Sequence, residues 1–371
     1  MTAFRSDLSF LAACLDGSPE KLALIPDTPE RDWEILIRTA AHELVLPALS
    51  HRLAQIGLQP PQEIAQYLAA VENLNCERNM RILEELRDIA LLLNRVGIEP
   101  VALKGAAFLL AGVYPRPGCR YLCDLDLLVT HSQLAAAAEV LERDGYLQDG
   151  RDALGRFRHH YPQLQRPRSA DGSGSAPVEL HHALGHGVSR KLLSGEDMVR
   201  GSSVKEWNGV RIRVPSPEHL LIHLISHSQV HHSYSERIWP PLRAMYDLAL
   251  LDRCLARCLD WEQVRRRFEV SGQESALLLH LLHVREALGM PLPFAFDLGP
   301  LGQVRWARRR ALNRWPILRL ADPLYLASAT LSRRIQFLAS ILSVPGGWKF
   351  AARTLYRSDF YRRLLAEIVL R

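Results

Sequence analysis

The chain has 371 residues, enough for two or three domains, so a single small domain is excluded. Hydrophobic residues make up 48% and charged residues 23%, which excludes global disorder. The formal net charge is +6, but residues 301–371 alone hold 14 Lys and Arg against three acidic residues. This basic tail could attract nucleic acid, anionic lipid or nucleotide phosphates, and an Arg-rich solvated helix face is an equally good interpretation.

Cysteine content and hydropathy bear on the compartment. Six cysteines are sparse for this length, and the first residues contain no long apolar segment after a basic start, so we expect a reducing, cytoplasmic location. No window approaches 18 uncharged apolar residues, and we therefore expect no transmembrane segment. Cys119/Cys123 and Cys254/Cys258 have C-x₃-C spacing, which differs from the C-x₂-C of zinc and redox motifs and predicts reduced structural thiols.

In chain order, apolar residues at helical spacing first predict a helical N-terminal region over residues 1–96. Gly97 is a suitable helix C-cap, and Pro100 prevents the helix from continuing. Strands and helices then alternate through residues 97–185, which predicts an α+β fold with a mixed sheet and helices.

The expected elements of this central part are a strand at 100–103, a helix at 106–113, a non-helical loop at 114–118, a strand at 124–129, a helix at 133–143 capped by Ser132, a strand within 156–166, a hairpin tip at 169–175 and a strand at 177–180. Residues 186–371 are expected to be mainly helical, with one strand at 210–214 and the basic tail at the end.

Two aspartates interrupt an apolar part of the sequence: Asp124 lies directly before the segment Leu125–Val129, and Asp126 lies within it. Side chains alternate between the faces of a strand, so Asp124 and Asp126 should point the same way. Two carboxylates that share a small site repel each other unless a cation lies between them, and hard oxygen ligands suit Mg²⁺ or Mn²⁺. A solvent-facing strand edge is the alternative, but Asp is a poor strand former.

Two further segments carry charged residues at expected ends of elements. Lys104 and Gly105 lie at a strand-to-helix turn, where a glycine lets the backbone approach a phosphate and Lys adds a positive charge. Glu179 lies between apolar residues on a later strand, and it can complete a cluster of three carboxylates if that strand neighbours the first. Taken by itself, this segment is better explained by an exposed strand face.

Together, Leu-Lys104-Gly105, Arg120, Asp124-Leu-Asp126 and Val-Glu179-Leu-His resemble the uncharacterised nucleotidyltransferase family of the DNA polymerase β superfamily. The resemblance covers roughly residues 95–250. It departs from the wider superfamily in having Lys-Gly, the form typical of this particular family, where Gly-Ser or Gly-Gly is usual, and in the longer interval to the first Asp. The third acid also lies beyond the long segment 130–175.

The resemblance implies transfer of a nucleoside monophosphate from an NTP such as ATP to a small-molecule or peptide acceptor. Asp124, Asp126 and Glu179 would then be the catalytic, metal-binding carboxylates for Mg²⁺ or Mn²⁺. Lys104 and Arg120 would neutralise phosphate charge, with Gly105 at the nucleotide. A non-catalytic nucleotide- or partner-binding module of the same fold and a nucleic-acid end-modifying enzyme are the alternatives.

A row of histidines recurs every fourth residue on an expected helix: His219, His223, His227 and His231. A metal site, a polar helix face along a substrate cleft and ordinary packing are all compatible with this row, since no known zinc signature accompanies it. The resemblance implies a helical partner domain here. The candidates for the substrate cleft are His181, His223, His227, Arg237 and Asp247.

Overall fold

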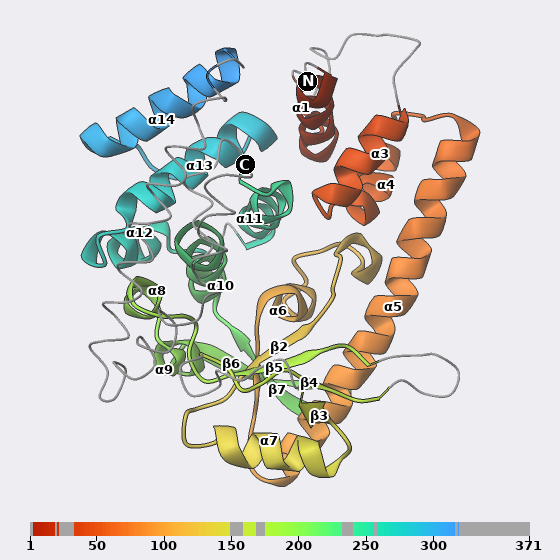
Figure 1. Ribbon diagram of the computed structural model, residues 1–371, viewed down its shortest axis with the longest axis vertical. Coiled ribbons are helices and arrows are strands. Elements are labelled where there is room, and N and C mark those ends of the chain that lie inside the picture. The colour runs from red at the N-terminus through yellow and green to blue at the C-terminus, as the bar shows by residue number, and fades with distance from the viewer. Residues whose placement is uncertain are drawn as a thin grey trace, which may run out of the picture.

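The computed structural model describes residues 3–18, 21, 33–148, 159–167, 175–231, 240–255, 258–315 and 318. Its centre is a mixed sheet with helices on both faces (Figure 1). The predicted α+β class is therefore confirmed. Within the described ranges, no helix combines the length and the apolarity needed to cross a membrane.

Helices form the N-terminal region, as predicted. They are α1 (Ala3–Asp16), α3 (Trp33–His42), α4 (Leu46–Gln55) and the long α5 (Gln62–Arg95). The helix α5 runs along one side of the molecule and reaches the sheet with its C-terminal end (Figure 1). Gly97 follows it with φ of 75°, the left-handed conformation that ends a helix at glycine.

Seven strands form one sheet in the order β3-β4-β5-β2-β1-β7-β6. Their bounds are β1 (Val101–Ala102), β2 (Leu125–Leu128), β3 (Leu147–Gln148), β4 (Leu164–Gln165), β5 (Val178–His181), β6 (Ser202–Trp207) and β7 (Val210–Pro215). The strand β2 is antiparallel to β1 and parallel to β5, while β1 is parallel to β7. The apolar residues of β2 and β5 are almost wholly buried, which fits strands covered on both faces.

Helices cover the two faces of this sheet. Those between the strands are α6 (Lys104–Leu110), the 3₁₀ turn η1 (Pro117–Cys119), α7 (Leu134–Arg143), α8 (Val188–Leu192) and α9 (Gly195–Arg200). Those after the last strand are α10 (Pro217–Ile225), the π-helix η3 (Ser226–His231), α11 (Leu242–Leu255), α12 (Trp261–Val270), α13 (Glu274–Leu288) and α14 (Gly299–Arg314). The helix α7 lies on one face of the sheet, and α6 and α10 lie on the other (Figure 1).

Several local predictions need correction. The loop at 114–118 ends in the 3₁₀ turn η1, because a 3₁₀ turn tolerates Pro at its first position. Ser132 does not cap α7, which begins at Leu134 after Gln133 without a side-chain cap. The strands β3 and β6 were not predicted, and β6 and β7 lie beyond residue 185 yet complete the sheet. The hairpin tip at 169–175 lies outside the described residues except for Ser175.

His280 in the middle of α13 leads to a prediction about pH. The side chain is fully buried, and neither ring nitrogen has a hydrogen-bond partner among the described residues. Burial lowers the pKa of His280 to about 3, far below its ordinary value, because the imidazolium cannot be solvated there. The unfolded chain therefore binds a proton at this residue near pH 6.5 that the folded chain does not bind.

Stability should consequently fall as the pH is lowered through 6.5. Between pH 7 and pH 5, His280 alone should reduce the free energy of unfolding by about 2 kcal/mol. Urea unfolding at the two pH values should show a smaller difference for His280→Leu than for the wild type, while the exposed His131→Leu should behave as the wild type. An unchanged pH dependence in His280→Leu would contradict the assignment.

Candidate functional site

The pairing of β2 with β5 brings together residues that lie more than fifty positions apart in the sequence. The two strands run parallel with Asp126 directly opposite Glu179 and Leu128 opposite His181. Residues two apart on a strand share a face, so Glu179 and His181 both lie on the side of Asp126. The strand that carries Glu179 therefore lies next to the strand that carries Asp126, which is the condition for Glu179 to join the acidic cluster.

Three side chains meet at this point. His181 Nε2 lies 2.8 Å from Asp126 Oδ1 and 3.4 Å from Glu179 Oε2. Asp126 is 2% exposed and His181 3% exposed, whereas Glu179 is half-buried. One ligand atom from each of the three lies within 4.8 Å of the other two, an arrangement that could hold a metal ion.

The charges in this cluster stabilise one another. Burial alone would raise the pKa of Asp126, but Lys104 and His181 outweigh burial and hold the pKa well below its usual range. The hydrogen bond from His181 likewise lowers the pKa of Glu179. For His181, burial favours the neutral ring, yet the bonds to the two carboxylates raise its pKa. Both acids are therefore carboxylates at neutral pH.

Lys104 approaches the same carboxylates from the start of α6. Its Nζ lies 2.6 Å from Asp126 Oδ1 and 4.0 Å from Glu179 Oε2. The residue has φ of 47°, a sparsely populated conformation for a side chain other than glycine that indicates local strain. At the next position, a Cβ on Gly105 would overlap the buried side chain of Leu122, so packing accounts for this glycine without any phosphate.

Asp124 lies at the edge of the cluster. It is half-buried immediately before β2, with Oδ1 3.4 Å from Cys123 Sγ. Burial and the nearby Asp126 raise its pKa. It is not one of the three residues whose ligand atoms lie mutually within 4.8 Å. His181, which the sequence predicted only as a residue of the substrate cleft, is the third member of this group, with Asp126 and Glu179.

Arg120 is held by other protein groups. Its Nε and Nη2 donate to the two carboxylate oxygens of Asp247 at 2.9 and 3.0 Å, and Nη1 donates to the carbonyl of Tyr121 at 2.5 Å. Tyr114 also donates to Asp247. Arg120 and Asp247 are both buried, so the pair joins the segment before β2 to α11. The Arg120 side chain thus has a structural partner besides any phosphate.

The backbone carbonyl of Arg120 is held by side chains of the long helix α5. Asn75 and Asn79 on α5 donate to it at 3.0 and 2.5 Å. These buried amides tie the loop before Asp124 to the long N-terminal helix. Sequence reasoning missed both asparagines, although two buried-face Asn residues four apart on an amphipathic helix are the signal that could have identified them.

A cavity of about 330 Å³ lies next to these residues. Five of its lining residues were predicted as site residues: Lys104, Arg120, His223, His227 and Asp247. Arg243, Glu43 and Ser228 add polar groups, and Phe108 and Leu220 add apolar ones. Asp124, Asp126, Glu179 and His181 are not among the residues that line this cavity, and Arg237 lies outside the described residues.

The histidine row is divided between two kinds of helix. His219 and His223 lie on α10, whereas His227 and His231 lie on the π-helix η3. The rings of His223 and His227 are 6.0 Å apart between centroids and line the cavity, while the buried ring of His219 packs against Gly201. The described geometry therefore favours a cleft face over a shared metal.

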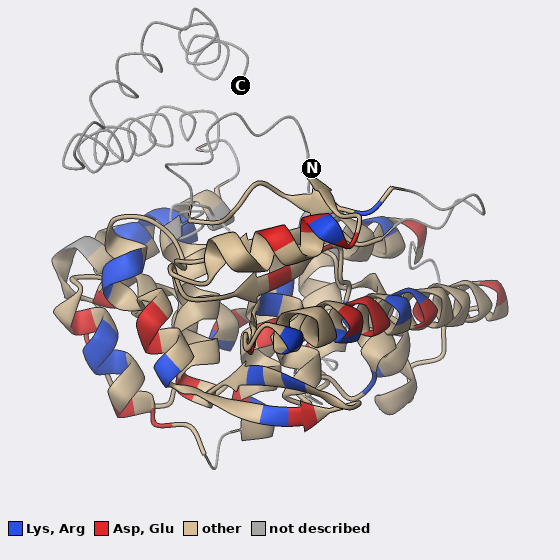
Figure 2. Cartoon of the chain, turned by 90° about the horizontal axis from the view of Figure 1, so that it is seen from below, with Lys and Arg blue, Asp and Glu red and all other residues tan. Residues whose placement is uncertain are grey.

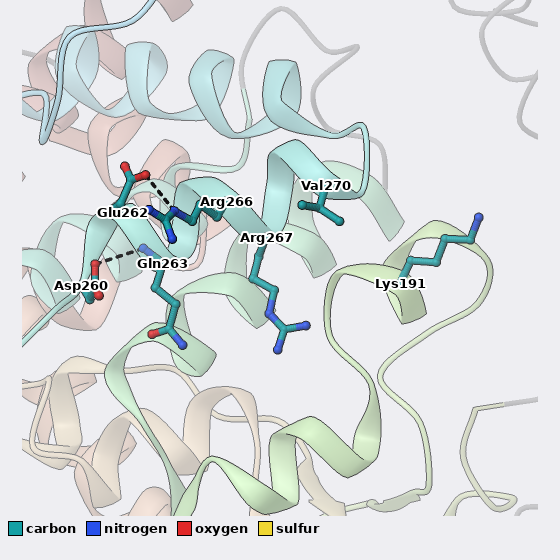
Figure 3. A pocket seen from close by; sticks show the side chains of 7 residues that line it. All are labelled: Lys191, Asp260, Glu262, Gln263, Arg266, Arg267 and Val270. Atoms are coloured by element: carbon teal, nitrogen blue, oxygen red, sulfur yellow. Dashed lines mark hydrogen bonds and ion pairs between the residues drawn. The ribbon is translucent and has the colours of Figure 1, made fainter.

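A second cavity of about 530 Å³ is formed by α8 and α12, and it contains none of the predicted residues. Its lining is Lys191, Asp260, Glu262, Gln263, Arg266, Arg267 and Val270 (Figure 3). Glu262 pairs with Arg266 at 3.0 Å, and Asp260 caps α12 through the Gln263 amide (Figure 3). The cavity of about 330 Å³, in contrast, is lined by Lys104, which contacts Asp126.

The mixed sheet, its helical flanks and the acidic cluster on neighbouring parallel strands define a nucleotidyltransferase-like α+β protein. The chain belongs to the uncharacterised nucleotidyltransferase family, whose profile matches residues 29–289. The match begins before α3 and ends just after α13, so it includes the whole sheet and the helices α3 to α13, but not α1, α14 or the basic tail.

Two further comparisons add little. A crystal structure of an antigenic nucleotidyltransferase-like protein from Paracoccidioides brasiliensis is similar at 15% sequence identity and a TM-score of 0.35. The alignment covers 55% of this chain and 89% of that chain, and a likeness at this level carries no argument. No curated protein matches the chain.

Proposed function

We propose that the chain is a divalent-metal-dependent enzyme that transfers a nucleoside monophosphate from an NTP to a small-molecule or peptide acceptor. The observation that carries this proposal is the pairing of Asp126 with Glu179 on parallel strands, beside a cavity lined by Lys104 and Arg243. A purely structural strand pair has no need for two ionised acids at a buried position, because their burial and repulsion cost free energy.

The donor set fits a hard divalent cation. Asp126 and Glu179 supply carboxylate oxygens within 4.8 Å of each other, and Asp124 is close enough that its charge is coupled to theirs. In this proposal the three acids would hold Mg²⁺ or Mn²⁺, and His181 would orient Asp126 through its 2.8 Å hydrogen bond. The bound ion would polarise the phosphate and stabilise the departing pyrophosphate.

The remaining groups of the site would bind and orient the substrates. Lys104 carries a positive charge, since the neighbouring carboxylates raise its pKa despite its burial, and it is placed to neutralise charge on the α-phosphate. Arg243 lines the cavity and provides a second cation for the triphosphate. Glu179 is half-buried and could accept the proton of the acceptor hydroxyl as the new phosphorus–oxygen bond forms.

Arg120 would act mainly by holding the segment before the acidic cluster in position. Its bidentate pair with Asp247 fixes the segment that leads to Asp124 and Asp126, four and six residues further on. We propose this positioning role in addition to the phosphate contact that the family resemblance implies. We also propose that the catalytic core begins near residue 97 and includes β6 and β7, with helical regions before and after it.

Nucleic-acid end modification is not the function that we propose. In the view of Figure 2, Lys and Arg lie among Asp and Glu, and α5 carries residues of both signs. A nucleic-acid groove requires a continuous stripe of positive charge. The basic tail at 301–371 lies outside the described residues beyond α14, apart from residues 315 and 318.

The proposal is tested by the thermal stability of the full chain with ATP, GTP, CTP or UTP, each with and without Mg²⁺ or Mn²⁺. At a nucleotide concentration of about 100 Kd, the free energy of unfolding should rise by about 2.7 kcal/mol, and only with metal. Glu179→Gln should lose this rise, whereas Glu139→Gln on the exposed face of α7 should keep it. No metal-dependent stabilisation by any NTP would favour the non-catalytic alternative.

A further inference from the structure

A second group of metal-ligating side chains lies away from the acidic cluster, where α4, α5 and η1 meet. His51 from α4, Glu72 from α5 and Cys119 from η1 each offer a ligand atom, and these atoms lie within 4.8 Å of one another. Cys119 Sγ is 3.9 Å from Glu72 Oε1. Cys119 is 3% and Glu72 7% exposed, so the group is a built and largely buried site.

A cation from the protein already lies among these ligands. Arg116 Nη2 contacts the Glu72 carboxylate and lies 3.0 Å from His51 Nδ1. A guanidinium can only donate hydrogen bonds, so Nδ1 of His51 is the acceptor, and its lone pair points towards Arg116. The Arg116 side chain is 56% exposed, which leaves it room to move out into solvent.

The imidazole is in the form that binds metals. Its Nε2 is buried and has no hydrogen-bond partner among the described residues. Thiolate, imidazole and carboxylate together form the ligand set that a borderline-soft ion such as Zn²⁺ accepts, with a fourth position left for water.

We propose that His51, Glu72 and Cys119 bind Zn²⁺, with Arg116 as the cation that the metal replaces. On binding, the S–H bond of Cys119 breaks and its proton goes to solvent, while the new bond forms between sulfur and zinc. The Arg116 guanidinium keeps its charge and turns outward. The spacing of Cys119 and Cys123 did not predict a zinc site, because the proposed partners of Cys119 are His51 and Glu72, which lie far from it in the sequence.

Zinc at this position would connect the N-terminal helices to the loop of the acidic site. Cys119 precedes Arg120, whose carbonyl is held by Asn75 and Asn79 from α5. A metal bond from α4 and α5 to Cys119 would therefore restrict the segment that carries Asp124 and Asp126 into position. This structural role does not depend on the proposed nucleotidyl transfer.

Cobalt titration of the chelator-treated full-length protein tests the proposal, because a Co²⁺–thiolate bond gives a near-ultraviolet charge-transfer band. We expect the wild type to show this band, Zn²⁺ to abolish it by displacement, and Cys119→Ser to lack it. Cys76→Ser, on α5 near Gly118, is the matched control and should keep the band. Cys123 lies beside Asp124 of the acidic site, so Cys123→Ser is a second control: the band should persist in this variant if Co²⁺ is bound by Cys119.

Arg116→Gln separates metal binding from a general loss of structure. Removing the competing cation should tighten Co²⁺ binding by about two- to fivefold, the effect of breaking a partly exposed ion pair. A structural disturbance would weaken it instead. The proposal is overturned if the wild type shows no thiolate band with Co²⁺, or if the band persists in Cys119→Ser.

Discussion

Asp126→Asn should lower the rate of pyrophosphate release from the preferred NTP by about 10³-fold or more, because it removes the central carboxylate of the proposed metal site. Asp126 contacts Lys104, His181 and, through the sheet register, Glu179. The measurement is steady-state pyrophosphate release with metal and a candidate acceptor. Asp88→Asn, an exposed aspartate on α5, should retain wild-type activity.

Folding must be checked for Asp126→Asn, since the variant leaves Lys104 and His181 with Glu179 as their remaining carboxylate partner. Removing one member of a buried ion pair costs about 3–5 kcal/mol. Circular dichroism and the melting temperature will show whether the variant is folded at the assay temperature. If folded Asp126→Asn releases pyrophosphate as fast as the wild type, Asp126 does not belong to the catalytic machinery.

Asp247→Ala should produce the largest loss of stability away from the acidic cluster. The variant leaves the guanidinium of Arg120 buried with two unpaired donors, which costs about 3–5 kcal/mol. The melting temperature should fall by roughly 4–6 °C, because an unfolding entropy of about 2.1 cal/mol/K per residue gives about 1.3 °C per kcal/mol for a chain of 371 residues. Differential scanning calorimetry measures the change.

The double variant Arg120→Met/Asp247→Leu distinguishes the broken pair from a simple packing defect. It replaces both partners by apolar side chains of similar volume and should recover most of the lost stability. Glu34→Ala, which removes an exposed pair with Arg38, should leave the melting temperature unchanged. A melting temperature of Asp247→Ala close to that of the wild type would show that the buried pair contributes little.

The sequence was most informative about the residues of the two central strands. Alternation around Asp126 and around Glu179 predicted strands with one acidic face, and the structure pairs these strands in parallel. Alternation reports only which face a residue takes. The register that sets Asp126 opposite Glu179 depends on the hydrogen-bonding partner of each strand, so it could not be predicted from either segment alone.

Long-range polar contacts were the least predictable feature. Arg120 and Asp247 were both expected near the substrate, but their pairing joins segments 127 residues apart and depends on where α11 packs against α10 and α13. The grouping of His51 and Glu72 with Cys119 has the same origin. In the histidine row, the spacing of four predicted one regular helix, whereas the helix changes from α to π at Ser226.

Manganese binding followed by electron paramagnetic resonance tests the central claim most directly, because the signal of free Mn²⁺ decreases as the ion is bound. The wild type should bind Mn²⁺ more tightly when a non-hydrolysable NTP is present, and Asp126→Asn should lose this nucleotide-dependent binding. Hard Mn²⁺ favours the carboxylates over the Cys119 group, so the two proposed sites are distinguished. Equal Mn²⁺ binding by the wild type and Asp126→Asn, with or without nucleotide, would contradict a metal-nucleotide site at Asp126 and Glu179.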